Sequence, residues 1–281
     1  MSVKIICDSA CDMSLEEAEK TGVKLVPLKT LIDGKEYRDG LDIKGPEFYR
    51  LLKSCKSGPG TSQVSPQEFL DVLEEAGREQ EIVLITMCGK LSGTAQSAAI
   101  AAAEFGGRVY HVDSLNVSAG EQVLLRYAVS LRDRGMDGKA IAEELERVKN
   151  KICLIGRLDT LEYLKRGGRI SKTTAFAGTM LNIKPVLELT GGEIKILGKA
   201  RGEKQSNNML NEFIDKKGGI DYSMPIMLAY SGLDRTLLDA YKENSRKLWE
   251  GKVETLSDCI VGSTIGTHAG PGAVLVAIFK K

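Results

Sequence analysis

Short apolar runs alternate with longer amphipathic segments along the chain. The runs VKIIC, EIVLITMC, RVYHVD, ICLIGRL, IMLAYSG and GAVLVAIF are rich in β-branched residues, as expected of strands that are buried on both faces of a sheet. Between several of these runs the apolar positions recur with helical spacing. The alternation predicts an α/β fold in which a mostly parallel sheet is covered by helices on both faces.

Two of the predicted helices have recognisable ends. Ser14 and Glu17 have the spacing of a capping box, and the helix that they begin should end at Gly22. Ser65 and Glu68 repeat this spacing, with a proline in the first turn between them. Both segments therefore carry their own start signals.

The pattern changes in the second half of the chain. A charged helical segment, MDGKAIAEELERVKNK, is followed by a new buried strand at Ile152, which predicts a domain boundary near residue 150. Residues 1–150 are predicted to form a Rossmann-like three-layer α/β sandwich. Residues 151–281 are predicted to form an α/β domain with a mixed sheet, because Gly191-Gly192 joins two strand patterns as a hairpin.

Charge and cysteine content narrow the possible functions. Lys and Arg number 39 and Asp and Glu 38, so a net charge of +1 provides no strong field for nucleic acid, and a dedicated nucleic-acid binder is not expected. No apolar run approaches the about 20 residues that span a bilayer. The start MSVKIICDS lacks the pattern of a signal peptide, and the six cysteines form no CxxC pair. We therefore expect a reduced, cytoplasmic protein.

Two polar loops are candidates for binding an anion, because ligands of open α/β sheets bind beyond the carboxyl ends of the strands. Ser92, Gly93 and Thr94 follow a predicted strand and begin an Ala-rich helix, where hydroxyls and free N–H groups favour an anion. Thr61 and Ser62 offer a second set of hydroxyl donors. The alternative is that either loop only caps a helix or a turn. Two such loops in one sheet favour a ligand.

A carboxylate suits these loops better than a nucleotide does. The chain has neither a GxxxxGK[ST] loop nor a GxGxxG loop with a following acidic residue. His268, in the glycine-rich turn GTHAGPGA, is the candidate imidazole, and the alternative is a capping or core histidine. His111, inside a predicted strand, is interpreted as structural. Two distant histidines and dispersed cysteines lack the spacing of metal ligands.

A basic cluster surrounds Gly167-Gly168 at the end of a short predicted helix. Lys165, Arg166 and Arg169 are either cations that neutralise the helix C-terminus or groups that face an anionic ligand or partner. The following segment, TTAFAGTMLNI, is small and apolar, which suits a close-packed helix or the lining of a narrow tunnel.

Seven motifs occur in an order that resembles the DegV family. They are DSACD, TSQVSP, LSGTAQSA, the DS of Asp113-Ser114, LKRGGRIS, LNIKPVL and HAGPGA, and they span the chain from Asp8 to Phe279. The resemblance implies a two-domain α/β protein that holds one long-chain fatty acid in a buried tunnel, with the carboxylate where the domains meet. For the members called FakB it implies the acyl-carrying subunit of a fatty acid kinase.

In that system a separate ATP-dependent subunit, FakA, phosphorylates the bound fatty acid to give acyl phosphate for phospholipid synthesis. The resemblance therefore implies no cofactor and no catalytic ATP site in this chain, and it allows transient membrane contact for acyl exchange. It also implies that Asp39 and Gly40, in a DGxxYxDG pattern, shape a loop and do not bind ligand.

The resemblance also implies which residues meet the ligand. The implied carboxylate ligands are Thr61, Ser62, Ser92, Gly93, Thr94 and His268. Arg169 is placed either beside the head group or toward the kinase partner. Because aromatic residues make up only 5% of the chain, we expect an aliphatic tunnel with methionine. Its candidate lining residues are Ile100, Phe176, Met180 and Leu181.

Other functions are compatible with the same residues. Ser92 and His268 could serve an acyl hydrolase, although the chain has no GxSxG elbow. A stand-alone kinase related to the dihydroxyacetone kinases would need its own nucleotide loop and carboxylates for Mg²⁺. A domain that binds some other small carboxylate would have a shallow polar pocket in place of a tunnel.

Overall fold

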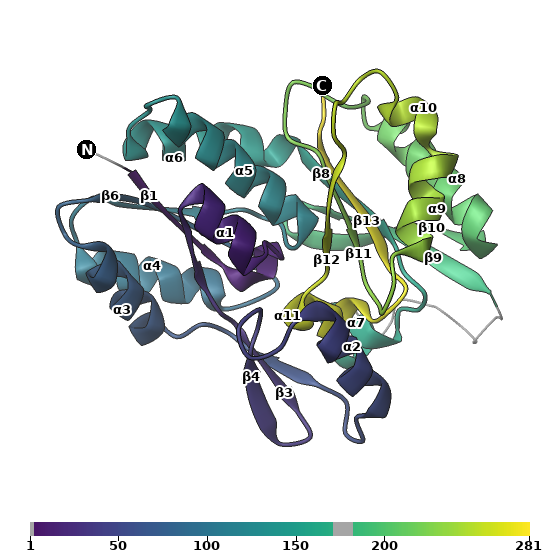
Figure 1. Ribbon diagram of the computed structural model, residues 1–281, viewed down its shortest axis with the longest axis horizontal. Helices are drawn as coiled ribbons and strands as arrows, with labels where there is room; N and C mark the ends of the chain where they lie inside the picture. Colours follow the sequence, from purple (N-terminus) through teal and green to yellow (C-terminus); the bar gives the residue numbers. More distant parts are fainter. Residues whose placement is uncertain (1–2, 171–181) are drawn as a thin grey trace.

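The computed structural model describes residues 3–170 and 182–281, and in these residues it has three sheets (Figure 1). The first sheet has four strands in the order β2-β1-β6-β7, and all its neighbouring pairs are parallel. Its strands are β1 (Val3–Asp8), β2 (Val23–Val26), β6 (Glu81–Thr86) and β7 (Val109–Asp113).

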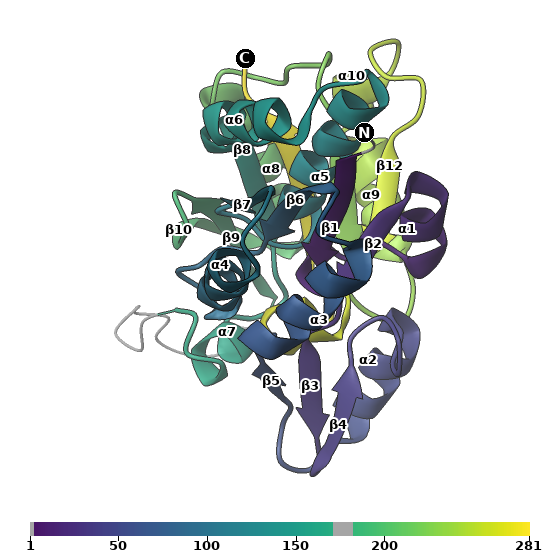
Figure 2. The same cartoon turned by 90° about the vertical axis from the view of Figure 1, so that its left-hand side faces the viewer.

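Helices cover both faces of the parallel sheet, with α3 and α4 on one side and α5 and α6 on the other (Figures 1 and 2). Together with α1 at the β2 edge, they are α1 (Leu15–Thr21), α3 (Pro66–Ala76), α4 (Thr94–Phe105), α5 (Ala119–Asp133) and α6 (Gly138–Val148). The caps predicted from sequence are present, because Ser14 accepts from the Glu17 N–H and Ser65 with Glu68 forms the full capping box. The α/β prediction for this half is confirmed.

The second sheet is mixed and has six strands in the order β10-β9-β8-β13-β11-β12. Only β11 and β12 pair in parallel. The strands are β8 (Ile152–Arg157), β9 (Ile183–Thr190), β10 (Glu193–Arg201), β11 (Met227–Tyr230), β12 (Ser257–Ile260) and β13 (Val274–Phe279). The predicted hairpin is confirmed, with both Gly191 and Gly192 at positive φ between β9 and β10.

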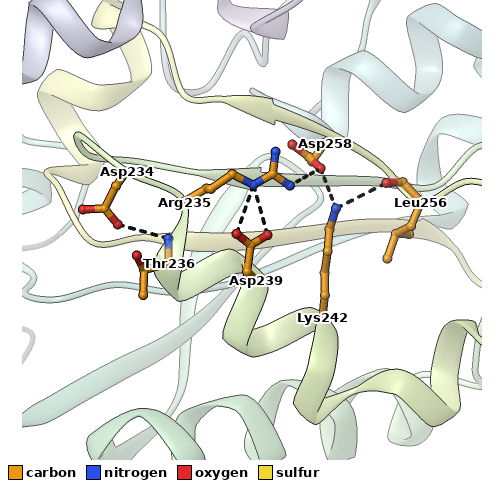
Figure 3. A network of polar contacts seen from close by, with 7 residues as sticks. All are labelled: Asp234, Arg235, Thr236, Asp239, Lys242, Leu256 and Asp258. Carbon is orange, nitrogen blue, oxygen red and sulfur yellow. Dashed lines mark hydrogen bonds and ion pairs between the residues drawn. The ribbon is translucent and has the colours of Figure 1, made fainter.

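The mixed sheet lies between α5 on one face and α8, α9 and α10 on the other (Figure 1). The helices that follow residue 150 are α7 (Glu162–Arg166), α8 (Gly202–Lys216), α9 (Thr236–Asn244), α10 (Arg246–Trp249) and α11 (Ser263–Ala269). At the β12 edge, Asp258 accepts from Arg235 and Lys242, which ties α9 to the strand that leads into α11 (Figure 3).

A third, small antiparallel sheet was not predicted from the sequence. Its strands, in the order β4-β3-β5, are β3 (Lys29–Ile32), β4 (Lys35–Arg38) and β5 (Gly60–Ser62). With α2 (Gly45–Ser54) it projects from the body of the molecule (Figure 2). Two 3-10 turns complete the described elements, η1 (Ser9–Cys11) and η2 (Lys149–Lys151).

The parallel sheet is built from strands before residue 150 and the mixed sheet from strands after it. The largest apolar core nevertheless runs through both, because α5 packs against β1 and also against β8 and β13. The division into domains 1–150 and 151–281 therefore stays a prediction.

Candidate functional site

A cavity of about 200 Å³ lies between the carboxyl ends of the parallel strands and the mixed sheet. Leu28, Met87 and Val117, which follow β2, β6 and β7, line one side of it. This is the edge at which open α/β sheets bind their ligands. Most of the lining side chains are aliphatic, so the cavity does not match a shallow polar pocket.

Alternate residues of two neighbouring strands form the apolar wall. Leu154 and Gly156 of β8 and Leu187 and Leu189 of β9 all line the cavity. Successive side chains of a strand point to opposite faces, so residues two apart meet the same space. A Cβ at Gly156 would overlap the side chain of Leu275, so glycine is what fits at this point of the wall.

Hydroxyl groups from two separate segments border the cavity. Thr61 and Ser62 lie on β5, and the Thr61 hydroxyl is 3.0 Å from Nε2 of His268. Ser92 and Gly93 line the cavity just before α4. The loops TSQ and LSGT, which are far apart in sequence, therefore meet at one place.

Thr94 does not line the cavity. It is fully buried, and its hydroxyl lies 2.9 Å from that of Ser92, whose Oγ also accepts from the Thr94 N–H. Gln63, which was not among the predicted ligands, lines the cavity and donates to Ser97. A Cβ at Gly93 would overlap the Gln63 amide, so a larger residue here would require the Gln63 side chain to move.

His268 lies in the last turn of α11 and not in a glycine-rich turn, which corrects the expectation from sequence. The helix ends at Gly270, whose φ is +71°. Burial, and secondly the charge of Arg169, lower the pKa of His268 to about 4. The imidazole is therefore neutral at pH 7. Its Nδ1 is buried and has no hydrogen-bond partner among the described residues.

Arg169 follows the Gly167-Gly168 turn and lines the cavity. Its Nε donates to the carbonyl of Leu91 at 3.0 Å, and its Nη1 donates to the carbonyl of Gly167 at 2.7 Å. A guanidinium has five N–H donors, and these bonds use two of them to hold the group in place. Gly167 also packs against the imidazole, since a Cβ there would overlap Nδ1 of His268.

The DSACD segment after β1 has a structural role at its first aspartate. Asp8 accepts hydrogen bonds from the N–H groups of Ala10 and Met87, at 2.9 and 2.7 Å. Burial raises the pKa of Asp8 to about 7, although both hydrogen bonds act in the opposite direction. The carboxyl group thus fixes the start of the Met87 loop, next to the cavity.

Of the four residues predicted to line the tunnel, Ile100 lies among the described residues. Ile100 is 47% exposed on the outer side of α4, so its prediction was wrong. Phe176, Met180 and Leu181 lie outside the described residues. The β8 and β9 wall was missed, because β8 is a continuous apolar run whose sequence does not indicate which residues face a cavity, although Leu187 and Leu189 alternate with Glu188 in β9.

The arrangement of the polar groups bears on two kinds of chemistry, nucleophilic catalysis and metal binding. His268 contacts Thr61 and Ser92 contacts Thr94, so among the described residues no Ser92–His268 hydrogen bond exists that would activate a nucleophile. In the same part of the chain, no three His, Cys, Asp or Glu side chains are grouped to hold a metal ion. Within residues 3–170 and 182–281, no helix is long and apolar enough to cross a membrane.

Comparison with known proteins gives consistent matches over the whole chain. The profile of the DegV family (Uncharacterised protein, DegV family) matches residues 2–281. A DegV domain-containing protein of Deinococcus radiodurans is 35% identical over 285 residues, which cover 99% of this chain and 98% of the relative.

Solved structures agree with the fold. A DegV family protein from Thermus thermophilus, described as binding fatty acid, superimposes with a TM-score of 0.88 at 35% identity and covers 100% of both chains. The fatty acid kinase (Fak) B3 protein of Streptococcus pneumoniae, loaded with linoleic acid, has a TM-score of 0.86, again over 100% of both chains. Its identity to this chain is 22%, so this second likeness supports the fold alone.

Proposed function

This chain belongs to the DegV family, and from this premise we propose that it binds one long-chain fatty acid in the cavity between its two main sheets. The observation that carries the proposal is an aliphatic cavity bordered at one side by hydroxyls, an imidazole and a guanidinium. A fatty acid has the same division into an apolar chain and one polar end.

In the proposed complex the acyl chain lies along the β8 and β9 wall. Each buried methylene contributes about 0.8 kcal/mol, so the chain supplies most of the binding free energy. The relative from Thermus thermophilus, described as binding fatty acid, supports this choice of ligand.

The carboxylate is proposed to lie beside the polar groups, where the two predicted domains meet. Hydroxyls of Thr61, Ser62 and Ser92 and the N–H groups at Gly93 would donate to it, and Thr94 would orient the Ser92 hydroxyl. Arg169 lines the same end of the cavity, where it would face either the carboxylate or the kinase partner. The remaining proposed ligand is His268, and its contact with Thr61 supports a position of the ring beside the head group.

We further propose that a separate ATP-dependent kinase acts on the bound fatty acid. The carboxylate would accept the γ-phosphoryl group of ATP, giving acyl phosphate and ADP. The absence of a nucleotide loop from the sequence supports a catalytic site on a partner. This role assigns the protein to the cytoplasm, with transient membrane contact for acyl exchange.

Native mass spectrometry of the purified protein tests the proposal. We expect one long-chain fatty acid per chain, released on denaturation and identified after organic extraction. An empty protein that also fails to take up added palmitate or oleate would contradict it. Assays of ester hydrolysis would then test the acyl hydrolase alternative.

The Arg169→Ala variant distinguishes a role of Arg169 in fatty acid binding from a role in phosphorylation by the kinase. We expect the variant to retain acyl chains but to be a poor substrate for the kinase subunit, because the guanidinium carries charge at the end where the partner must approach. Loss of bound lipid with unchanged partner binding would instead assign Arg169 to the ligand. Arg38→Ala, which removes an exposed arginine paired with Asp42, is the matched control.

A further inference from the structure

Two carboxylates from the first 40 residues hold the start of α11. The Gly262 N–H donates to Asp12 Oδ1 at 2.9 Å, and the Ser263 N–H donates to Asp39 Oδ1 at 2.8 Å. The Thr264 N–H donates to the second oxygen of Asp39 at 3.3 Å. The first N–H groups of a helix have no partners within the helix, so these bonds fix the position of its first turn.

Asp39 is itself held from several directions. It is 4% exposed, and its oxygens also accept from the hydroxyls of Ser263 and Ser9, at 2.8 and 3.3 Å. Ser9 in turn accepts from the Leu28 N–H at 3.0 Å, and the Asp39 N–H donates to the carbonyl of Leu28. The carboxylate is therefore a rigid point in the structure and not a mobile surface group.

The other end of α11 carries the head-group residue His268. Ile265 and Ala269 of the same helix also line the cavity. Seven residues of helix span only about 10 Å, so a rotation or displacement of the first turn moves the imidazole as well. Gly270 ends the helix directly after Ala269.

The hydrogen bonds around Asp39 and Ser263 also restrain Thr61, the residue that contacts the imidazole. The Ser263 hydroxyl lies 2.9 Å from that of Thr30, and Thr30 on β3 is paired in register with Thr61 on β5. Ser263, which donates to Asp39, is therefore linked to both partners of the Thr61–His268 contact. It is linked to His268 through α11 and to Thr61 through Thr30.

The contact between α11 and α2 restrains the distance between the two helices more than it restrains rotation about the axis of α11. Gly266 lies against the rings of Phe48 and Tyr49, and Tyr49 donates to the carbonyl of Val261 at 3.0 Å. These contacts fix how close α11 lies to α2. A glycine against flat rings opposes rotation about the helix axis weakly, whereas directional hydrogen bonds to successive N–H groups oppose it strongly.

We propose that Asp12 and Asp39 are positioning residues of the head-group site, which set the orientation of His268 against Thr61 and thereby the preference for a carboxylate over other polar ends. The proposal rests on the proposed function. It gives the DSACD and DGxxYxDG motifs, neither of which contributes a proposed ligand, a part in recognition.

Paired ligands test the proposal. The dissociation constants of palmitic acid and of 1-hexadecanol, which share the chain and differ in the head group, are measured for the wild type, Asp39→Ala, Asp39→Asn and Asp12→Asn. We expect Asp39→Ala to weaken binding of the acid about ten-fold, in line with the loss of a helix N-cap and its charge, and to leave the alcohol unchanged. Asp39→Asn keeps one oxygen acceptor, so its affinity for the acid should lie between those of the wild type and Asp39→Ala.

The matched control is Asp42→Asn, which removes a carboxylate of the same loop that, within the described part of the chain, hydrogen-bonds to Arg38 alone. It should bind both ligands as the wild type does. An equal loss of acid and alcohol affinity in the Asp39 variants, or an unchanged preference in folded variants, would overturn the proposal.

A spectroscopic readout tests the same point without a ligand. The chain has two histidines, so the imidazole ¹⁵N resonances of His268 can be compared with those of His111, which contacts Thr86. Asp39→Ala should shift the His268 signals and leave those of His111 in place. Unchanged His268 signals would refute the positioning role. A wild type that binds neither ligand would refute the proposed function, and the NMR result would still decide the inference.

Discussion

The apolar wall and the polar end of the cavity are assembled in different ways. One side of the cavity, the apolar wall, is formed by alternate residues of β8 and β9, neighbours in one sheet. The polar end takes Thr61 from an edge strand, Ser92 from a loop, Arg169 from a turn and His268 from a short helix. Register within a sheet therefore determines the wall, whereas the polar end depends on how several separate elements are packed together.

Because of this difference, we expect the wall to govern the affinity for a long acyl chain and the polar end to govern the selectivity for its head group. The wall contributes a free energy that grows with buried apolar area, about 25 cal/mol per Å². A single hydrogen bond contributes about 1 kcal/mol net, and more when one partner is charged. Changes to the wall should therefore alter how tightly any long chain binds. Changes at the polar end should alter which head group is preferred.

The largest effect is expected from filling the space beside the wall. Ile194 on the edge strand β10 lines the cavity and is only partly buried, so Ile194→Trp can occupy the cavity without disrupting a central strand. We expect affinity for palmitate to fall about 50-fold or more, the equivalent of about three methylenes that no longer fit. Isothermal titration calorimetry measures it.

Ile196→Trp is the control for that substitution. Ile196 is on the same strand two residues away and packs against the core, but it does not line the cavity. Similar losses in both variants would show that the strand, and not the cavity, had been damaged.

A smaller and selective effect is expected at the polar end. Ser92→Ala should lower palmitate affinity about ten-fold, because one hydrogen bond to a charged group is lost, while 1-hexadecanol affinity changes little. The thermal midpoint should fall by only a few degrees, because the buried Thr94 hydroxyl loses its bond to Ser92. Ser54→Ala, at an exposed hydroxyl on α2, is the control. A folded Ser92→Ala protein with unchanged palmitate affinity would remove Ser92 from the proposed ligands.

The histidine at the polar end should also affect stability as a function of pH. The pKa of His268 falls from 6.5 in the unfolded chain to about 4 in the folded protein, so the unfolded state binds more protons between these values. Stability from this group is present above pH 6.5 and is lost as the pH falls toward 4. Between pH 7 and pH 5 the wild type should lose about 1–2 kcal/mol more than His268→Gln does.

Urea unfolding of both proteins at the two pH values measures this difference. Comparing the wild type with the variant removes the contribution of Asp8, whose pKa of about 7 gives the opposite slope. Equal losses in the two proteins would mean that His268 titrates normally and is more exposed to water than the structure indicates.

The smallest effect is expected away from both regions. Ile100→Ser replaces a side chain that is 47% exposed on α4. Binding of acid and alcohol should be unchanged, and the free energy of unfolding should change by about 0.5 kcal/mol or less. A clear loss of affinity would indicate that α4 contacts the ligand, as sequence reasoning had expected of Ile100.

Local signals in the sequence determined much of the fold. The capping residues Ser14 and Ser65 and the Gly191-Gly192 hairpin act over a few neighbours, and the structure contains each of them. The loops that carry Thr61 and Ser92 were recognisable for the same reason, because hydroxyls and glycines at strand ends and helix starts are local features.

Only the tertiary structure decided how these parts meet. The hydrogen bonds from α11 to Asp39 join residues 224 and 225 positions apart, and the Thr61–His268 contact spans 207. No period or cap encodes such pairs, because they arise when separate elements are packed against one core. For this reason the sequence indicated a group of candidate ligands, whereas packing placed His268 on a helix, moved Thr94 behind Ser92 and turned Ile100 to solvent.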